Sequence, residues 1–431
     1  MRVSERTTLY YGWWITAVAF VTNVFAWSTR ASFSVLYVAM LHSTGWSRTQ
    51  GVLGYALSWV LLAVFAPLAG WLYDRFGPRL VVPAGGISLA LGIALTSLVH
   101  VPWQFYLSYG LLVGFGISAT LSPSSALLSR WFVQRRGTVL GINAAGASLG
   151  TVVSLPLMAA VIAHTGWRTA LLWYAVALLV GLVPLPALVY RRDPRDLGLK
   201  PDGRTQAHAT MLPITSERDW RVRTAMRTLS FWAAFVMLML GVIAFQVLTT
   251  HQVAHATDKG IAAGRAAFIF GLLGVYQFGG NLVGGWLSDR WGRQWVFACG
   301  SLLGVLATAV LASLSGPHEI WKLHVYAAAM GIGFGARISL LSAIPADIFG
   351  GPRFGLILGL LQAGSGIGGF IGPTLGGAVY DASGSYTVAF AVAGGAVLLS
   401  GVAAWFARPA VLHPVEQPIS GSDAVKPPGH T

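Results

Sequence analysis

Twelve runs of about 20 or more mostly apolar residues follow one another along this chain of 431 residues. A helix needs about 20 apolar residues to cross the hydrocarbon core of a bilayer, which is about 30 Å thick. Several runs contain Gly and Pro, which transmembrane helices tolerate because lipid offers the backbone no competing hydrogen bonds. We therefore predict an all-α membrane protein with twelve transmembrane helices, at residues 12–41, 51–72, 80–99, 103–128, 137–163, 170–190, 229–254, 263–287, 295–314, 323–344, 355–379 and 386–406.

The charged residues support this prediction. Only 10% of the residues are charged, against about 25% in soluble domains, which excludes a soluble enzyme. A net charge of +14 would indicate a nucleic-acid partner only if the basic residues formed one solvated face. Instead, 21 of the 28 Lys and Arg residues lie in the termini and loops of a single side of the predicted spans. This asymmetry identifies the cytoplasmic side, so we expect cytoplasmic termini, a lipid bilayer as partner and no nucleic acid.

One polar segment, residues 191–228, divides the spans into two groups of six. It carries nine Lys and Arg residues and is typical of a cytoplasmic linker. The predicted domains are therefore a six-helix bundle at 1–190, this linker, and a second bundle at 229–407. A Pro-rich polar tail at 408–431 is predicted to be disordered. No Asn begins a glycosylation sequon and Arg outnumbers Lys, which favours a bacterial inner membrane.

The two groups of six spans repeat one another. Gly70-Trp-Leu-Tyr-Asp-Arg-Phe-Gly77 follows the second span, and Gly285-Trp-Leu-Ser-Asp-Arg-Trp-Gly292 follows the eighth. The offset between matching positions stays between 215 and 218 residues, as four further pairs indicate: Gly137 with Gly355, Gly141 with Gly359, Gly146 with Gly364 and Gly150 with Gly368. A duplicated six-helix unit predicts two pseudo-symmetric bundles, the plan of transporters that rock one half against the other.

The duplicated Gly-x-x-x-Asp-Arg-x-Gly motif resembles the inner-loop signature of the major facilitator superfamily (MFS), and the resemblance covers nearly the whole chain. Tyr11-Gly-Trp-Trp14 and Trp131-Phe-x-x-Arg-Arg-Gly137 are similar to signatures of monocarboxylate transporters and their oxalate–formate antiporter relatives. The resemblance implies the MFS fold. It also implies alternating-access transport, active or facilitative, of small organic anions, such as lactate- or pyruvate-like monocarboxylates, with dicarboxylates as the second option.

The resemblance further implies a gate at the inner side, held closed by the charges of the duplicated motif. These gating residues would be Asp74, Arg75, Arg79, Asp289, Arg290 and Arg293. Topology signalling explains the arginines equally well. It does not explain the aspartates.

Arg30 and Arg337 are the charges that fall within predicted spans. Burying an Arg at the bilayer centre costs about 2.5–3.5 kcal/mol, and none of the 14 Asp and Glu residues lies mid-span to pair with it. A guanidinium binds a carboxylate through two parallel hydrogen bonds, so we predict that the substrate is the missing partner. Arg337 lies 12 residues before Phe349, about 18 Å from the inner end of its span. Arg30 lies nearer the outer side, where snorkelling to the surface is the alternative.

Polar residues in the same spans extend the predicted substrate site. Thr120 is the repeat counterpart of Arg337, and Asn143 and Gln362 occupy the fifth and eleventh spans, where helix–helix hydrogen bonding explains them equally well. Gln277 and Asn281 share one face of the eighth span. In the monocarboxylate transporters that the chain resembles, an Asp–Arg pair stands on the corresponding face. Proton coupling is assigned to the Asp of that pair.

This departure argues against proton symport by that route. Exchange, facilitation, or a proton relay elsewhere remain open, and His251 is the candidate for such a relay. The predicted small-molecule partners are therefore a carboxylate and either a proton or a counter-anion. We also predict that the protein functions as a monomer.

Two other functions are alternatives to organic-anion transport. An exporter of amphipathic drugs would favour a mid-span Asp or Glu, and a membrane sensor would favour an appended signalling domain; the sequence contains neither. An enzyme would need a convergent nucleophile, base or metal set. We therefore predict no enzymatic activity, no cofactor and no metal.

Overall fold

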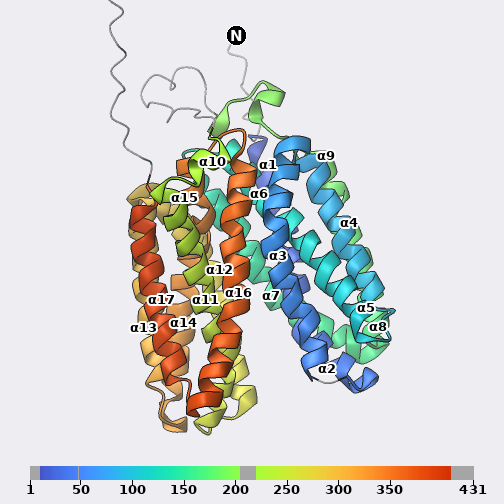
Figure 1. Ribbon diagram of the computed structural model, residues 1–431, viewed down its shortest axis with the longest axis vertical. Coiled ribbons are helices and arrows are strands. Elements are labelled where there is room, and N and C mark those ends of the chain that lie inside the picture. Colours follow the sequence, from blue (N-terminus) through green and yellow to red (C-terminus); the bar gives the residue numbers. More distant parts are fainter. Residues whose placement is uncertain (1–9, 47, 204–219, 409–431) are drawn as a thin grey trace, which may run out of the picture.

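The computed structural model describes residues 10–46, 48–203 and 220–408, and these residues form helices without a β-strand. The helices gather into two bundles (Figure 1). The N-terminal bundle contains α1 (Gly12–Ala31), α2 (Phe33–Thr44), α3 (Arg48–Phe76), α4 (Pro78–Thr96), α5 (Pro102–Phe105), the π-helix η1 (Tyr106–Val113), α6 (Gly114–Trp131), α7 (Arg136–Thr165), α8 (Trp167–Leu182) and α9 (Pro184–Val189). The C-terminal bundle contains α11 (Leu229–Asp258), α12 (Ala263–Trp291), α13 (Arg293–Ala312), the short 3-10 helix η5 (Pro317–Glu319), α14 (Ile320–Ile338), α15 (Leu340–Phe349), α16 (Phe354–Ser383) and α17 (Thr387–Phe406).

Eleven helical segments of the described chain are long and apolar enough to cross a membrane. The predicted span that is not among these eleven, residues 12–41, contains α1, whose Thr, Ser, Asn and Arg residues lower its mean hydropathy. Four of the predicted spans contain a change of helix: α1 gives way to α2 at Ser32, η1 to α6 at Gly114, α8 to α9 at Val183, and α14 to α15 at Ser339. The predicted all-α membrane fold is confirmed.

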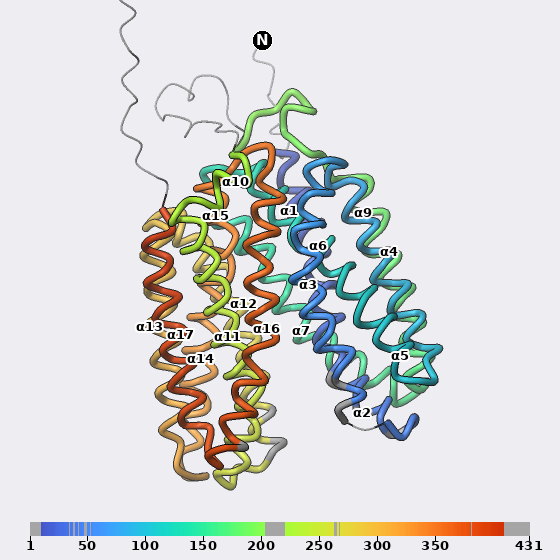
Figure 2. The backbone as a smooth tube through the Cα atoms, in the orientation of Figure 1, coloured from blue at the N-terminus to red at the C-terminus, as the bar shows by residue number. Residues whose placement is uncertain are grey.

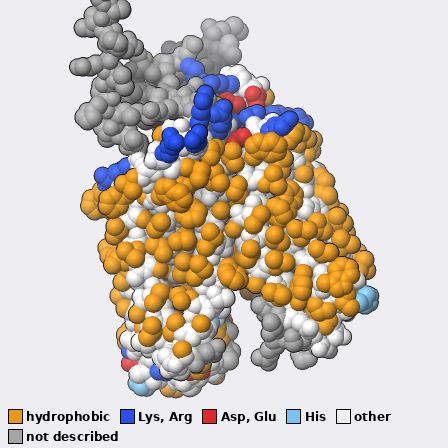
Figure 3. All heavy atoms as spheres, in the orientation of Figure 1, with side chains coloured by type: hydrophobic (Ala, Val, Ile, Leu, Met, Phe, Trp, Pro, Cys, Tyr) orange, Lys and Arg blue, Asp and Glu red, His pale blue; other side chains and the backbone are white. Residues whose placement is uncertain are grey.

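The two bundles converge at one end and diverge at the other (Figures 1 and 2). We call the first the linker end, because residues 191–203 and the short α10 (Val222–Ala225) lie there, and the second the far end. A space-filling view shows a cleft between the bundles at the far end and a concentration of Lys and Arg side chains at the linker end (Figure 3). The molecule is therefore closed at its basic end and open at the other.

Glycines allow the two bundles to pack backbone against backbone. A Cβ atom on Gly70 of α3 would overlap the carbonyl oxygen of Gly355 of α16, and one on Gly285 of α12 would overlap the carbonyl oxygen of Gly137 of α7. Along α16 the contact with α3 continues to Gly369, 14 residues or about 21 Å farther along the helix. The repeated glycines of the sequence thus lie where the bundles meet.

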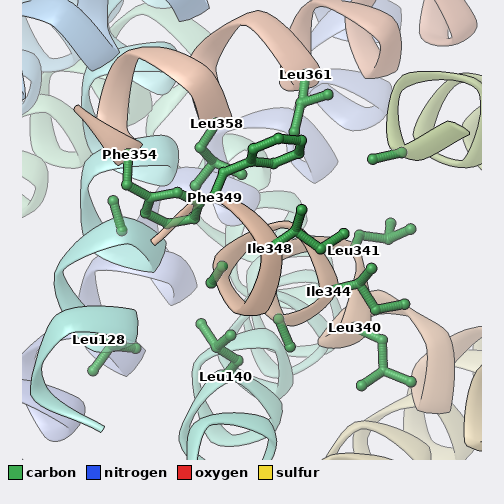
Figure 4. Close-up of a cluster of buried hydrophobic side chains, with 14 of the residues drawn as sticks. Leu128, Leu140, Leu340, Leu341, Ile344, Ile348, Phe349, Phe354, Leu358 and Leu361 are labelled. Carbon is green, nitrogen blue, oxygen red and sulfur yellow. The ribbon is translucent and has the colours of Figure 1, made fainter. Parts of the chain in front are cut away.

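A hydrophobic cluster closes the linker end between these helix pairs (Figure 4). It combines side chains of α15 with those of α6, α7 and α16, and its labelled members are Leu128, Leu140, Leu340, Leu341, Ile344, Ile348, Phe349, Phe354, Leu358 and Leu361. Because residues of both bundles contribute, opening the linker end would expose apolar surface.

The last glycine of each duplicated motif has a conformational role. Gly77, the N-cap residue just before α4, has φ 79°, and Gly292, the N-cap residue just before α13, has φ 95°. Side chains other than glycine are rarely tolerated at such angles. This explains why both copies of the motif end in Gly after the same number of residues.

Parts of the predicted linker and tail lie outside the described residues. Within the predicted linker, 191–203 and 220–228 are described, and 204–219 are not. The predicted disordered tail is described only at Arg408, and residues 1–9 are likewise not described.

Candidate functional site

Arg30 is a buried cation at the last turn of α1. Only 5% of its surface is exposed, so the alternative that it snorkels to the surface does not hold. Its guanidinium carbon lies 3.8 Å from the centre of the Trp59 ring of α3, a favourable cation–π distance. Among the described residues, its two terminal nitrogens have no hydrogen-bond partner. Arg30 can therefore accept an anion without first breaking an ion pair.

Aromatic residues hold the end of α1 that carries Arg30. The Tyr109 hydroxyl donates a hydrogen bond to the carbonyl oxygen of Thr29 at 3.1 Å, and Phe33 stacks on Tyr55 with ring centres 4.5 Å apart. These contacts fix the backbone on both sides of Arg30. The guanidinium is thus preorganised rather than mobile.

Trp59 connects Arg30 to the opposite bundle. Gly369 of α16 packs so closely on the Trp59 ring that a Cβ atom there would overlap it. The cation–π pair therefore lies at the contact between the bundles, in the direction of the far-end cleft.

Arg337, which the sequence predicts to bind substrate near the midplane, contacts helices of its own bundle. It is 3% exposed, and its Nη2 donates to the Ser400 hydroxyl of α17 at 2.7 Å. The guanidinium carbon lies 4.5 Å from the Phe297 ring centre of α13, and Nε has no partner among the described atoms. These contacts lie inside the C-terminal bundle, so Arg30 and Arg337 do not form one site.

Thr120, the repeat counterpart of Arg337, is fully buried, and its hydroxyl donates to the carbonyl oxygen of Gly116 in its own helix at 3.0 Å. It thus also contacts its own bundle. The geometry gives neither residue a direct contact with the interface between the bundles.

The predicted amides lie nearer that interface. Asn281 of α12 donates from Nδ2 to the Ser148 hydroxyl of α7 at 3.1 Å, which joins the two bundles. Asn143 of α7 accepts a hydrogen bond from Asn23 Nδ2 at its carbonyl oxygen, 2.7 Å away, and its own side-chain oxygen lacks a described partner.

Two further predicted residues extend the same region. The backbone of Gln277 packs against Gly331 and Gly335 of α14, and its side chain is nearly buried. Gln362 is half-buried on α16. The structure thus distributes the predicted amides over helices that line the contact between the bundles.

His251 of α11 lies toward the far end. Its Nε2 is 3.1 Å from the carbonyl oxygen of Pro373 of α16, and its ring centre is 5.0 Å from that of Tyr386. The residue therefore joins helices within the C-terminal bundle.

We call the charged residues that meet at the linker end the gate, after the role that the sequence predicts for Asp74 and Asp289. Asp74, at the end of α3, accepts hydrogen bonds from the backbone N–H groups of Gly355 and Leu356 at 3.1 and 2.7 Å. Asp289, at the end of α12, accepts hydrogen bonds from those of Gly137 and Thr138 at 2.8 and 2.7 Å. Each aspartate thus caps the first turn of a helix of the opposite bundle, where unpaired N–H groups and the helix dipole favour a carboxylate.

The arginines of the gate differ from those predicted. Arg75 and Arg290 are exposed and lie over the Trp71 and Trp286 rings of their own helices. Arg79 donates to the carbonyl oxygen of Ala187 within its own bundle. The contacts described for these three arginines lie within their own bundles, so their gating role stays a prediction. Arg293 does belong to the gate, because it pairs with Asp289 and Asp347.

Sequence reasoning missed three members of the gate. Arg130 pairs with Asp74 at 3.3 Å and donates to the carbonyl oxygen of Pro352 in the opposite bundle at 2.8 Å. Arg136 pairs across the bundles with Asp347. The duplication contained a signal for them, because Arg130 and Asp347 stand 217 residues apart, within the repeat offset.

We expect Asp74→Asn and Asp289→Asn each to reduce uptake at least fivefold while leaving folding intact. An amide keeps one acceptor oxygen but loses the charge-assisted bonds, which contribute about 1.5–3 kcal/mol to a stable contact. Uptake by reconstituted protein, with melting temperature measured in parallel, tests this. Asp258→Asn, an exposed position at the far end, is the matched control. Wild-type uptake in both gate variants at equal expression would remove the aspartates from the gate.

Two helical bundles that are joined by polar contacts at one end and separated by a cleft at the other have the architecture of a secondary transporter. The chain belongs to the Major Facilitator Superfamily, whose family model matches residues 17–276 and 252–428. It is similar to monocarboxylate transporters. Monocarboxylate transporter 13 of Rattus norvegicus is 30% identical over 404 residues, 91% of this chain and 87% of the relative. Monocarboxylate transporter 11 of Homo sapiens is 27% identical over 412 residues, 93% of this chain and 84% of the relative.

Solved structures share the fold. The human organic anion transporter MFSD10 superimposes with a TM-score of 0.71 at 16% identity, covering 91% of this chain and 99% of the other. FucP in its outward conformation gives 0.70 at 15% identity, covering 92% and 99%. The predicted family and branch are confirmed. The named relatives are mammalian, so a bacterial inner membrane stays a prediction.

Proposed function

We propose that this protein carries small organic anions, monocarboxylates first, across a membrane by alternating access. The observation that carries the proposal is the buried Arg30 guanidinium, whose terminal nitrogens lack partners beside the contact between the bundles. A single cation without a carboxylate partner suits a substrate with one negative charge. The similar proteins are a monocarboxylate transporter and an organic anion transporter by name, which agrees with this choice.

The substrate carboxylate would bind Arg30 through both terminal nitrogens. Two parallel hydrogen bonds give a strong and oriented contact, and the anion offsets the cost of burying an unpaired charge. Trp59 contacts both Arg30 and Gly369 of α16. A substrate that pulls the guanidinium away from the Trp59 ring would free this ring to move, which would loosen its contact with Gly369 of the opposite bundle. Binding and rocking would be coupled in this way.

The linker end would face the cytoplasm. Lys and Arg side chains concentrate there (Figure 3), as the positive-inside rule requires. The described arrangement would then be an outward-open state, and substrate would enter through the far-end cleft. The proposed location is a bacterial inner membrane.

Gln277 makes exchange or facilitated transport the preferred modes, since an amide does not release a proton. His251 is the candidate relay if transport is proton-coupled. We further propose that one copy of the chain suffices, because each bundle contributes to the same interface.

Uptake by purified protein in liposomes tests the function. A panel of labelled monocarboxylates, dicarboxylates and cationic amphiphiles would be offered with and without a pH gradient. We expect saturable uptake of monocarboxylates, faster when the liposomes contain unlabelled acid. Transport of cationic amphiphiles without transport of any acid would replace this proposal with a drug exporter.

Arg337 is the second candidate cation, and its position inside the C-terminal bundle sets the expectation. We expect Arg337→Met to leave the substrate Kd within about threefold of the wild-type value. The melting temperature should be unchanged or higher, because the variant removes a buried positive charge that has no carboxylate partner among the described residues. Substrate-induced thermal shift and uptake measure both quantities. A loss of affinity of thirtyfold or more would restore the sequence-based prediction that Arg337 binds the carboxylate.

A further inference from the structure

The first residues of the linker form hydrogen bonds with residues at the gate. Residues 191–203, which we call the linker strap, lie across the linker end of the N-terminal bundle. The Trp131 indole N–H donates to the carbonyl oxygen of Arg191 at 2.9 Å, and the Tyr10 hydroxyl donates to that of Lys200 at 3.1 Å. Arg192 donates to the backbone carbonyl oxygen of Asp74 at 2.6 Å. The strap thus contacts the backbone of one gate aspartate directly.

Asp202 fastens the strap to the loop between α6 and α7. Its carboxylate accepts hydrogen bonds from three successive backbone N–H groups, those of Val133 at 2.9 Å, Gln134 at 2.8 Å and Arg135 at 3.4 Å. Asp202 has φ 59°, the one left-handed residue other than glycine in the described chain. Such a conformation is unfavourable for a residue with a Cβ atom and persists where other contacts hold it.

The same loop leads into the amides that the opposite bundle uses. Two residues after Arg135, the N–H groups of Gly137 and Thr138 bind Asp289. Arg135 itself gives α7 no side-chain cap. Two carboxylates therefore bind nearly consecutive backbone N–H groups at the start of α7. Asp202 of the linker binds those up to residue 135, and Asp289 of the second bundle binds those of residues 137 and 138.

We propose that Asp202 is a positioning residue of the gate: it holds the α6–α7 loop in the conformation that Asp289 caps, so that the linker stabilises the closed linker end. This inference rests on the proposed alternating access. It assigns the linker a role in the conformational equilibrium beyond joining the bundles. Two other aspartates of the same strap supply a matched control. Asp193 accepts a hydrogen bond from the N–H group of Arg195, and Asp196 accepts one from that of Asp193, both within the strap.

A cysteine reporter measures the equilibrium without reference to any substrate. Ala343 of α15 is fully buried and lies one helical turn before Asp347, on the face toward the N-terminal bundle. In a Cys299→Ser background, Ala343→Cys should react slowly with a maleimide added from the linker side. Opening of that end should raise the rate.

Two substitutions separate the carboxylate from the backbone conformation. Asp202→Gly removes the acceptor and tolerates the left-handed backbone, whereas Asp202→Asn keeps one acceptor oxygen. We expect labelling to accelerate at least fivefold in Asp202→Gly, less in Asp202→Asn, and not in Asp196→Asn. Equal rates in Asp202→Gly and the parent would overturn the proposal.

A double substitution tests whether Asp202 acts through the gate. In an Asp289→Asn background, Asp202→Gly should change the labelling rate less than twofold, because the cap that it positions is already weakened. An undiminished fivefold effect would show that Asp202 stabilises the bundle independently and overturn the positioning role. If no carboxylate is transported while these labelling results hold, the proposed substrate fails and the linker inference stands.

Discussion

Replacement of Arg30 with glutamine is expected to reduce carboxylate affinity at least thirtyfold. Removing one partner of a buried, charge-assisted contact costs about 2–5 kcal/mol, and each 1.4 kcal/mol is a factor of ten. Arg30 has no competing ion pair among its described neighbours, so the energy of its contact with the carboxylate should appear in full as substrate affinity. Arg30→Lys should recover only part of it, because an ammonium lacks the planar fork and stacks less well on Trp59.

Equilibrium binding of a labelled monocarboxylate to purified protein measures the effect, with uptake in liposomes beside it. Arg290→Gln is the control, since that arginine is exposed at the linker end and lies over its own helix's Trp286. If Arg30→Gln binds and carries monocarboxylates as wild type does, Arg30 is a structural partner of Trp59 and the proposed site is wrong.

Gly70→Ala is expected to shift the protein strongly away from the state described here. The added methyl group would overlap the Gly355 carbonyl oxygen, and a backbone atom in a packed helix cannot move aside as a side chain does. Overpacking of this kind costs about 1–3 kcal/mol, a change of roughly 5- to 150-fold in the balance between the closed and open linker end. Uptake should fall accordingly.

Labelling of the Ala343→Cys reporter from the linker side measures that shift. Gly279→Ala places a methyl group on α12 where nothing lies within 4 Å of it, and this variant should label and transport normally. An unchanged labelling rate in Gly70→Ala would mean that the α3–α16 contact does not limit opening.

The sequence predicted the bundles and the two gate aspartates because both follow from repetition. A glycine that needs a positive φ and a carboxylate that caps a helix recur at a fixed offset, and Asp74 and Asp289 have equivalent contacts in the structure. The arginine partners were predicted less well. Adjacent residues on a helix point in different directions, so Arg75 and Arg290 turn away from the helix ends that their neighbours cap.

Arg337 illustrates what depth alone leaves open. Counting residues gave its distance from the end of the helix but not the neighbours that its side chain meets. Gly331 and Gly335 of α14 face α12, whereas Gly333 and Arg337 face Gly300 of α13. The direction of the guanidinium depends on which glycine face packs against which helix, and only the assembled bundle determines that.

Among the side chains that the structure describes, the charged contacts between the two bundles occur at one end of the molecule: the Arg136–Asp347 ion pair and the hydrogen bonds that Asp74 and Asp289 accept from backbone N–H groups. An empty carrier must therefore break them unaided each time it reorients, whereas a loaded carrier can use its binding energy. We expect the unloaded return to be the slow step of the cycle. Transport would then be fastest when acid is present on both sides of the membrane, so that one molecule exchanges for another. It would be slowest when the receiving compartment contains no acid and the carrier must return empty.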